Sequence, residues 1–170
     1  MIRHLLVMSC ALAVPLSSLT DEPTVRVQPP HLQGSRPLEA PTESAVLRDY
    51  LQSWKTLQLA LDQNQANLLD QNFVGTAREK IANTIDEQSK LGIHTRYQER
   101  SHEIQIVFYS PDGQSIQMID NVDYEQRVFD HDSILSMRPI RERYVIVLTP
   151  TDVRWKVRVF QADAGQPSKS

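Results

Sequence analysis

The sequence lacks the features that mark disulfide-stabilised proteins, metalloproteins and nucleic-acid binders. Cys10 is its one cysteine, so no disulfide can form within the chain and no cysteine-based zinc site exists. His94, His102 and His131 fit no known metal-ligand spacing, and we expect neither a metal nor another cofactor. The formal net charge is -3, whereas nucleic-acid-binding domains are usually basic. A catalytic signature motif is also missing, so function has to be inferred from how the elements are arranged.

The first residues form a pattern typical of a secretory signal peptide. Arg3 supplies a positive charge, and an almost wholly apolar run at 5–16 follows it. This run is too short to span a bilayer, which favours a cleaved signal over a retained anchor. We therefore predict a signal peptide at 1–19, export to the periplasm or the medium, and no membrane span after cleavage. Val7-Met8-Ser9-Cys10 loosely resembles a bacterial lipobox, but the very short apolar run before it makes a lipoprotein the less favoured alternative.

Residues 20–41 are rich in proline, glutamine, serine and threonine. Their prolines rule out a continuous helix or a central strand. We expect a disordered linker between the signal and the folded part. The C-terminal residues 163–170 are predicted to be a polar tail.

Residues 42–162 are predicted to form one α+β domain that begins with helices. Apolar residues recur at steps of three and four over 42–63, which predicts a first helix with one apolar stripe. A shorter helix is expected at 67–73, ended by Gly75. A third should run from Thr76 to about residue 91, where the next residue is a glycine.

Apolar and polar residues alternate through most of 102–160, which is the period of half-buried strands. Four such strands follow one another with short connections, so we predict a four-stranded antiparallel meander. The last connection, 149–152, is expected to set Leu148 opposite Val153. One face of this sheet needs cover, and the preceding helices supply it.

Turn chemistry and alternation agree on the first hairpin. Ser110-Pro111-Asp112-Gly113 is typical of a type I turn followed by a left-handed glycine, which makes a three-residue hairpin loop. That loop would set Phe108 opposite Ile116 and Ile104 opposite Asp120. Every even-numbered residue then shares one face, as the apolar pattern also demands.

The order of these elements resembles the NTF2-like cone fold. The residues that carry the resemblance are Tyr50-Leu51-x-x-Trp54 on the first helix, Ser110-Pro111-Asp112-Gly113-Gln114 at the first hairpin, and Arg143-Tyr144-x-x-x-Leu148 followed by Arg154-Trp155-Lys156-Val157. This ending is similar to that of SnoaL-like proteins and of the IMS domain of plastid-division proteins. The superfamily includes ketosteroid isomerases, dehydratases, transport adaptors and secretion-system subunits. The resemblance therefore implies a fold and no single activity.

A cone fold would enclose a pocket between the concave sheet face and the helices, and polar residues on that face are candidates for acid–base chemistry. They are His102, Asp120, Glu142 and Tyr144, with Tyr124 as a further hydrogen-bond donor. His102 should lie diagonal to Asp120, within side-chain reach. One register of the second hairpin would also set Asp120 opposite Glu142. Alternatively, a single bulge would turn Asp120 to solvent, and the arginines flanking Glu142 would hold it in a surface ion-pair patch.

Aromatic residues on the same face are expected to line a pocket for a small apolar ligand: Tyr50, Trp54, Tyr124, Tyr144 and Trp155. The plainer interpretation is that a tryptophan and a tyrosine on a helical stripe belong to the core, and it is the more common outcome.

The opposite sheet face is expected to associate with another protein or a second copy. It would carry the apolar residues Val107, Tyr109, Ile119, Val145 and Val147, and an apolar sheet face is rarely left bare. Arg154, Lys156 and Arg158 make a basic stripe beside it. Too few aromatic residues interleave this stripe for nucleic-acid binding.

Two classes of function follow. The first, which we prefer, is an exported binding or protein-interaction module without catalysis. The second is a small-molecule isomerase or dehydratase that uses the acid–base residues of the concave face. A deep cavity with His102 and Asp120 in contact would favour the enzyme, whereas an interior filled by Trp54, Phe73 and Trp155 would favour the module.

Overall fold

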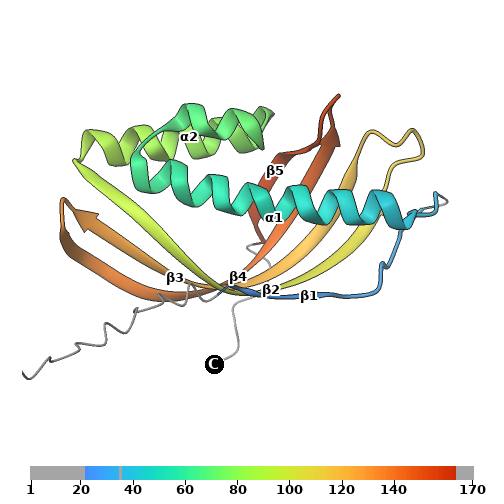
Figure 1. Ribbon diagram of the computed structural model, residues 1–170, viewed down its shortest axis with the longest axis horizontal. Helices are drawn as coiled ribbons and strands as arrows, with labels where there is room; N and C mark the ends of the chain where they lie inside the picture. Colours follow the sequence, from blue (N-terminus) through green and yellow to red (C-terminus); the bar gives the residue numbers. More distant parts are fainter. Residues whose placement is uncertain (1–21, 35, 164–170) are drawn as a thin grey trace, which may run out of the picture.

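A layer of helices lies on the concave side of a strongly curved sheet in the computed structural model, which describes residues 22–34 and 36–163 (Figure 1). The helical layer contains α1 (Ala40–Gln63), the short 3-10 helix η1 (Ala66–Gln71) and α2 (Gly75–Lys90). This is the predicted α+β class, with the helices at about the predicted positions. The predicted signal peptide lies outside the described residues, as does all of the predicted tail after residue 163. None of the helices in the described ranges is long and apolar enough to cross a membrane.

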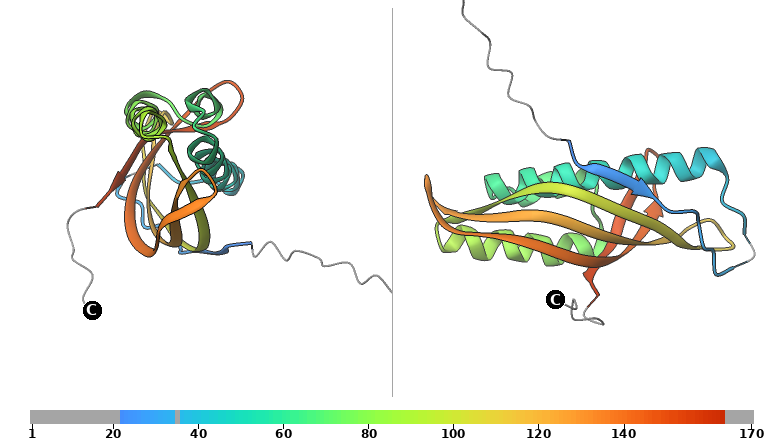
Figure 2. Two further views of the ribbon diagram at one scale, coloured as in Figure 1. Left: turned by 90° about the vertical axis from the view of Figure 1, so that its left-hand side faces the viewer. Right: turned by 90° about the horizontal axis from the view of Figure 1, so that it is seen from below.

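The sheet has five strands in the order β1-β2-β3-β4-β5. The four later strands, β2 (Ile93–Tyr109), β3 (Ile116–Asp130), β4 (Ser133–Pro150) and β5 (Trp155–Ala162), form the predicted antiparallel meander. The prediction of four strands was nevertheless wrong. A further strand, β1 (Thr24–Val27), pairs in parallel with β2, which makes the sheet mixed (Figure 2).

This extra strand corrects the prediction of a disordered linker at 20–41. Beyond β1, the backbone N–H groups of Gln28, His31 and Gln33 donate to carbonyls along the edge of β2. Arg36 stacks over the Tyr109 ring at 4.7 Å. The prolines permit this arrangement because an edge strand needs backbone donors on one side only.

Helix α1 is anchored by its apolar stripe. Pro41 sits in the first turn, where its missing N–H is not needed, and Asn64 ends the helix in a left-handed conformation with φ 54°. Tyr50 and Trp54 are 0% and 1% exposed. Gly75 does not end the preceding helix as predicted. It is the first residue of α2, and its φ of +55° turns the chain into that helix.

The first hairpin has the predicted turn but not the whole predicted register. Ile104 lies opposite Asp120 as expected. A bulge between Ile106 and Phe108 then shifts the pairing, so that Phe108 lies opposite Gln117 and not opposite Ile116. The same bulge turns Tyr109 to the concave face, where it is 7% exposed. Tyr109 therefore belongs to the core, and its assignment to the outer face was wrong.

Two later registers also differ from the predictions. Asp120 lies opposite Tyr144, not opposite Glu142, because the second hairpin pairs Phe129 with Ile134 and the bulge between Val128 and Phe129 then shifts the pairing by one more residue. The last strand begins at Trp155, so Leu148 pairs with Val157. Val153, predicted as its partner, lies in the connection and is 81% exposed.

Candidate functional site

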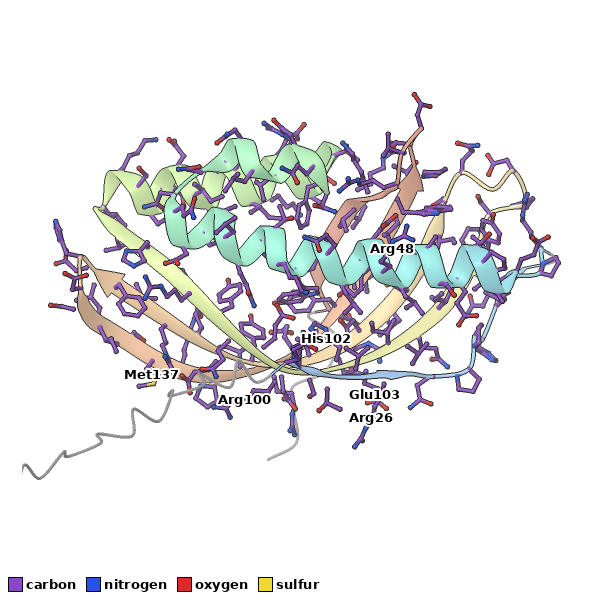
Figure 3. All side chains as sticks on the ribbon, in the orientation of Figure 1. Arg26, Arg48, Arg100, His102, Glu103 and Met137 are labelled. Carbon is purple, nitrogen blue, oxygen red and sulfur yellow. The ribbon has the colours of Figure 1, made fainter. Side chains whose placement is uncertain are left out.

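His102, one of the residues predicted to act as acid or base, lies between α1 and the middle of the sheet (Figure 3), and Asp120 is buried with it. Trp54 reaches down from α1 into this space, and its ring contacts His102 from β2 with centroids 5.2 Å apart. Tyr144 of β4 and Phe160 of β5 pack edge-on against the same indole at 5.7 and 5.4 Å. Helix and sheet thus meet across a closely packed aromatic cluster.

A chain of hydrogen bonds runs through this cluster. The Trp54 indole N–H donates to the Tyr50 hydroxyl oxygen at 2.9 Å. The Tyr50 hydroxyl donates to Asp120 Oδ2 at 2.7 Å. His102 Nδ1 lies 2.7 Å from the same carboxylate oxygen. The predicted contact between His102 and Asp120 is therefore present, and a helix residue shares it.

The other side of His102 contacts Glu99, which the sequence analysis missed. His102 Nε2 lies 2.9 Å from Glu99 Oε2, and Gln58 of α1 donates to the second carboxylate oxygen of Glu99. A bulge between Glu99 and Ser101 brings the odd-numbered Glu99 to the same face as the even-numbered His102. Strict alternation would place Glu99 on the outer face, so the apolar–polar pattern of the sequence could not predict its contact with His102.

His102 is held in its charged form. Burial by itself lowers its pKa, but the hydrogen bonds to Asp120 and Glu99 and the charges of these two carboxylates outweigh burial and raise the pKa to about 9. As an imidazolium, His102 donates from both ring nitrogens, one to each carboxylate. We call this arrangement of Glu99, His102, Asp120 and Tyr50 the interior network.

Tyr50 is the neutral member of the interior network. Burial, followed by the negative charge of Asp120, raises the pKa of its hydroxyl well above the usual range. The hydroxyl therefore stays protonated and remains a donor to Asp120. The second oxygen of that carboxylate, Oδ1, is buried without a hydrogen-bond partner among the described residues.

Of the remaining predicted residues, Tyr124 and Tyr144 lie in the interior, whereas Glu142 and Trp155 lie away from the interior network. Tyr124 and Tyr144 join the aromatic cluster, with their hydroxyl oxygens 3.0 Å apart, and burial raises the pKa of both. Glu142 lies opposite Val122 and makes no hydrogen bond with Asp120, so the predicted pair of carboxylates does not form. Trp155 lies towards the start of α1, where its backbone N–H donates to Asp49 at 2.9 Å. It is half-buried and does not join the rings around Trp54.

The interior network is sealed by this packing. The side chains of His102 and Asp120 are each 0% exposed, and that of Glu99 is 8% exposed. The carboxylate and imidazolium could exchange a proton with each other. From the concave side, a substrate could reach them only if α1 or the aromatic cluster moved aside.

No protein-family model matches this sequence, and no curated protein matches it either. Solved structures do match its fold. The intermembrane-space region of the chloroplast protein ARC6 superposes with a TM-score of 0.60 at 12% identity, covering 75% of this chain and 98% of that one. A candidate scytalone dehydratase from Novosphingobium aromaticivorans superposes with a TM-score of 0.53 at 16% identity, covering 73% of this chain and 87% of that one. The protein has the NTF2-like fold.

At these identities the likeness extends to the fold alone. It confirms the NTF2-like cone that the order of helices and strands indicated. In this NTF2-like chain, the space between α1 and the sheet holds the interior network and the rings around Trp54.

Proposed function

We propose that this NTF2-like protein is a binding or protein-interaction module and that its interior network is structural. The observation that carries the proposal is the burial of the acid–base groups, since the side chains of His102 and Asp120 have no exposed surface. A general acid or base must come within hydrogen-bond reach of a substrate atom. Here the positions from which a substrate would be reached are filled by the side chains of Tyr50 and Trp54.

The alternative is an isomerase or dehydratase that uses the same groups. Two observations favour it: a carboxylate, an imidazolium and tyrosine hydroxyls meet in the cone, and a candidate dehydratase shares the fold. Catalysis would require an opening of at least a few hundred Å³, the usual size of a small-molecule site, between α1 and the sheet. The alternative therefore predicts that His102 meets solvent often.

Exchange of the histidine C2 proton for deuterium, followed by mass spectrometry, distinguishes these functions. Each histidine is measured at its own titration midpoint. We expect His102 to exchange at least about tenfold more slowly than His131, because the His102 ring is fully enclosed. His131 is the internal reference, with a side chain 89% exposed. Equal rates for the two histidines would contradict the module and support an open active site.

We further propose that the module is exported. The basis is the signal-like pattern at 1–19, which lies outside the described residues. The intermembrane-space region of ARC6 shows that the same fold occurs in a domain outside the cytosol.

The outer sheet face is the surface we propose for association, with a second copy or another protein. Ile119, Val145 and Val147 point to this face and are partly exposed, as is Val107 in the bulge between Ile106 and Phe108. Tyr109 no longer counts among them because it is buried. Covering this apolar surface would remove it from water, which is the main driving force of protein association.

Replacing both Val145 and Val147 with lysine is expected to give a folded monomer, because two charges on this face oppose its burial. Sedimentation equilibrium at high micromolar concentration measures the change against a dimeric wild type. The matched control replaces the exposed α1 residues Gln52 and Gln63 with lysine, which adds the same charge and should leave association unchanged. A monomeric wild type at that concentration would contradict a homodimer through this face.

A further inference from the structure

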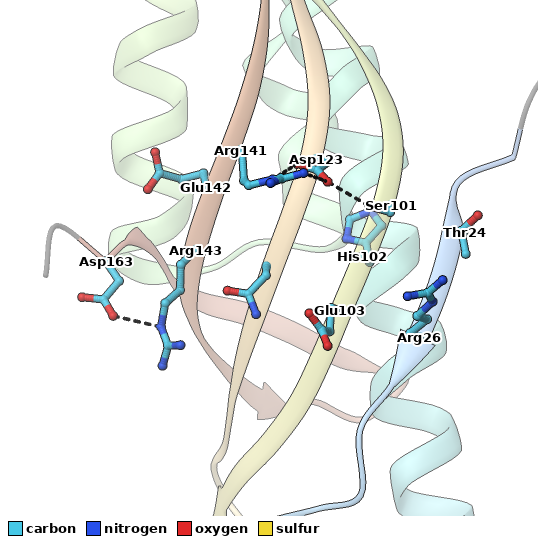
Figure 4. Close-up of a pocket in the computed structure, with 11 residues that line it drawn as sticks. Thr24, Arg26, Ser101, His102, Glu103, Asp123, Arg141, Glu142, Arg143 and Asp163 are labelled. Carbon is cyan, nitrogen blue, oxygen red and sulfur yellow. Dashed lines mark hydrogen bonds and ion pairs between the residues drawn. The ribbon is translucent and has the colours of Figure 1, made fainter. Parts of the chain in front are cut away.

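A groove of about 760 Å³ crosses the outer face of the sheet (Figure 4). Its floor is formed by β2, β3 and β4, with β1 along one side and the end of β5 along the other. Arg26 lies at the β1 side and Arg143 at the β5 side, as Figure 4 shows. A volume of this size lies within the range of small-molecule sites.

Four polar side chains form one row across this groove. The strand registers pair Arg26 with Glu103, Glu103 with Asn121, and Asn121 with Arg143. Neighbouring strands lie about 4.8 Å apart, so the two arginines stand three spacings, or about 14 Å, from each other. The row therefore presents a cation at each end with a carboxylate and an amide between them.

The groups of this row keep free hydrogen-bonding capacity. Among the described residues, Arg143 bonds through its Nε alone, which donates to Asp163 at 3.1 Å. This contact fixes the guanidinium and leaves both terminal nitrogens for a ligand. The Arg26 side chain makes no hydrogen bond or ion pair with residues 22–34 or 36–163. Glu103 accepts one hydrogen bond, from Gln28 at 2.7 Å, on one of its two oxygens.

The charges that line the groove exclude some classes of ligand. A polyanion such as a nucleic acid would meet the carboxylates of Glu103 and Asp123 on the groove floor. A second copy packed face to face, about a two-fold axis parallel to the strands, would set Arg26 against Arg143. The row instead fits a ligand with an anion at each end and a cation in the middle.

We propose that this groove binds an extended peptide segment with acidic side chains four residues apart and a basic side chain midway between them. This proposal rests on the protein being a binding module and names its partner class. An extended chain rises about 3.3–3.4 Å per residue, so residues i and i+4 are about 13–14 Å apart and match the spacing of the two arginines. Arginine binds carboxylates through paired N–H donors. The basic side chain at i+2 then lies next to Glu103.

The test is fluorescence anisotropy with a labelled, terminally blocked peptide of sequence EVKVE. Its comparison peptide, EEVVK, has the same composition with the acidic residues adjacent. We expect the wild-type protein to bind EVKVE at least about tenfold more tightly. Replacing either Arg26 or Arg143 with alanine should weaken EVKVE binding about tenfold, the size of one charge-assisted hydrogen-bond pair. Arg158→Ala is the matched control, since Arg158 is exposed and lies outside the groove.

Charge reversal gives a second readout. The double variant Arg26→Glu, Arg143→Glu should lose EVKVE and bind the charge-reversed peptide KVEVK better than the wild type does. Equal affinity for EVKVE and EEVVK, or binding unaffected by Arg26→Ala and Arg143→Ala, would overturn the groove assignment. If His102 still exchanges slowly in that case, the module survives and only this partner class is removed. Rapid exchange at His102 would remove the module whatever the peptides do.

Discussion

Replacing Trp54 with alanine is expected to lower the free energy of unfolding by about 3–5 kcal/mol, the range for large aromatic deletions in cores. Trp54 is 1% exposed and touches rings from β2, β3, β4 and β5. Its removal leaves a cavity between α1 and the sheet and also deletes the N–H that donates to Tyr50. Urea denaturation of both proteins at pH 7 measures the difference.

Leu59→Ala on the same helix is the matched control. Leu59 is 45% exposed, so its truncation should cost less than about 1 kcal/mol. A similar small loss for Trp54→Ala would mean that the interior is loosely filled. That result would favour the enzyme alternative, in which a substrate occupies the same space.

Asp120→Asn is expected to cost about 3 kcal/mol at pH 6. Removing one partner of a buried ion pair leaves the other charge uncompensated, which typically costs about 3–5 kcal/mol. We expect a cost at the lower end of this range because Glu99 still accepts a hydrogen bond from the other ring nitrogen of His102. The amide oxygen also remains available to accept the Tyr50 hydroxyl.

This cost should depend on pH in a defined direction. The pKa of His102 is raised in the folded protein to about 9, against about 6.5 for an unperturbed histidine. The folded state therefore binds one proton more than the unfolded state between these two values. Stability from this proton is fully present below about pH 6.5 and is lost as the pH rises through about 9, by about 3 kcal/mol in total. The gap between wild type and Asp120→Asn should narrow over that window.

Asp123→Asn is the control for this experiment. Asp123 lies on the same strand but on the outer face, where its carboxylate accepts from Arg141 at 2.7 Å and the side chain is 34% exposed. Exposed ion pairs of this kind contribute about 0–1 kcal/mol. Equal losses from the two substitutions, or a gap that does not change between pH 6 and pH 10, would show that His102 is not charged in the folded protein.

The regular part of the fold was predictable because burial imposes a period on the sequence. The stripe on α1 and the alternation in β2 and β3 follow directly from which side chains are removed from water. The Pro111–Gly113 turn fixed the register well enough to bring His102 beside Asp120, as the 2.7 Å contact confirms. Strand β1 gave no such signal, because all four of its residues are exposed and it is held by backbone hydrogen bonds.

Two of the misplaced residues, Glu99 and Tyr109, lie next to β-bulges. A bulge adds one residue to one strand and reverses the faces beyond it, without requiring a particular side chain. The bulge at Ile106/Phe108 moved Tyr109 into the core, and the one at Glu99/Ser101 brought Glu99 to His102. Glu142 is separated from Asp120 by a register that differs from the expected one by two residues, of which the bulge at Val128/Phe129 supplies one and the pairing at the second hairpin the other. The contact between His102 and Asp120, at the centre of the interior network, was therefore predictable from the sequence. The contacts of Glu99 and Tyr50 at its two ends were not.

An NMR titration of the His102 ring in the intact protein between pH 5 and pH 11 measures directly whether the buried histidine carries a charge. A charged histidine sealed between Asp120 and Glu99 should titrate near pH 9, more than two pH units above an ordinary histidine. The exposed His131 provides the reference signal in the same spectra. A midpoint near 6.5 or below would contradict the account, because the ring would then be neutral at physiological pH and free to act as a base.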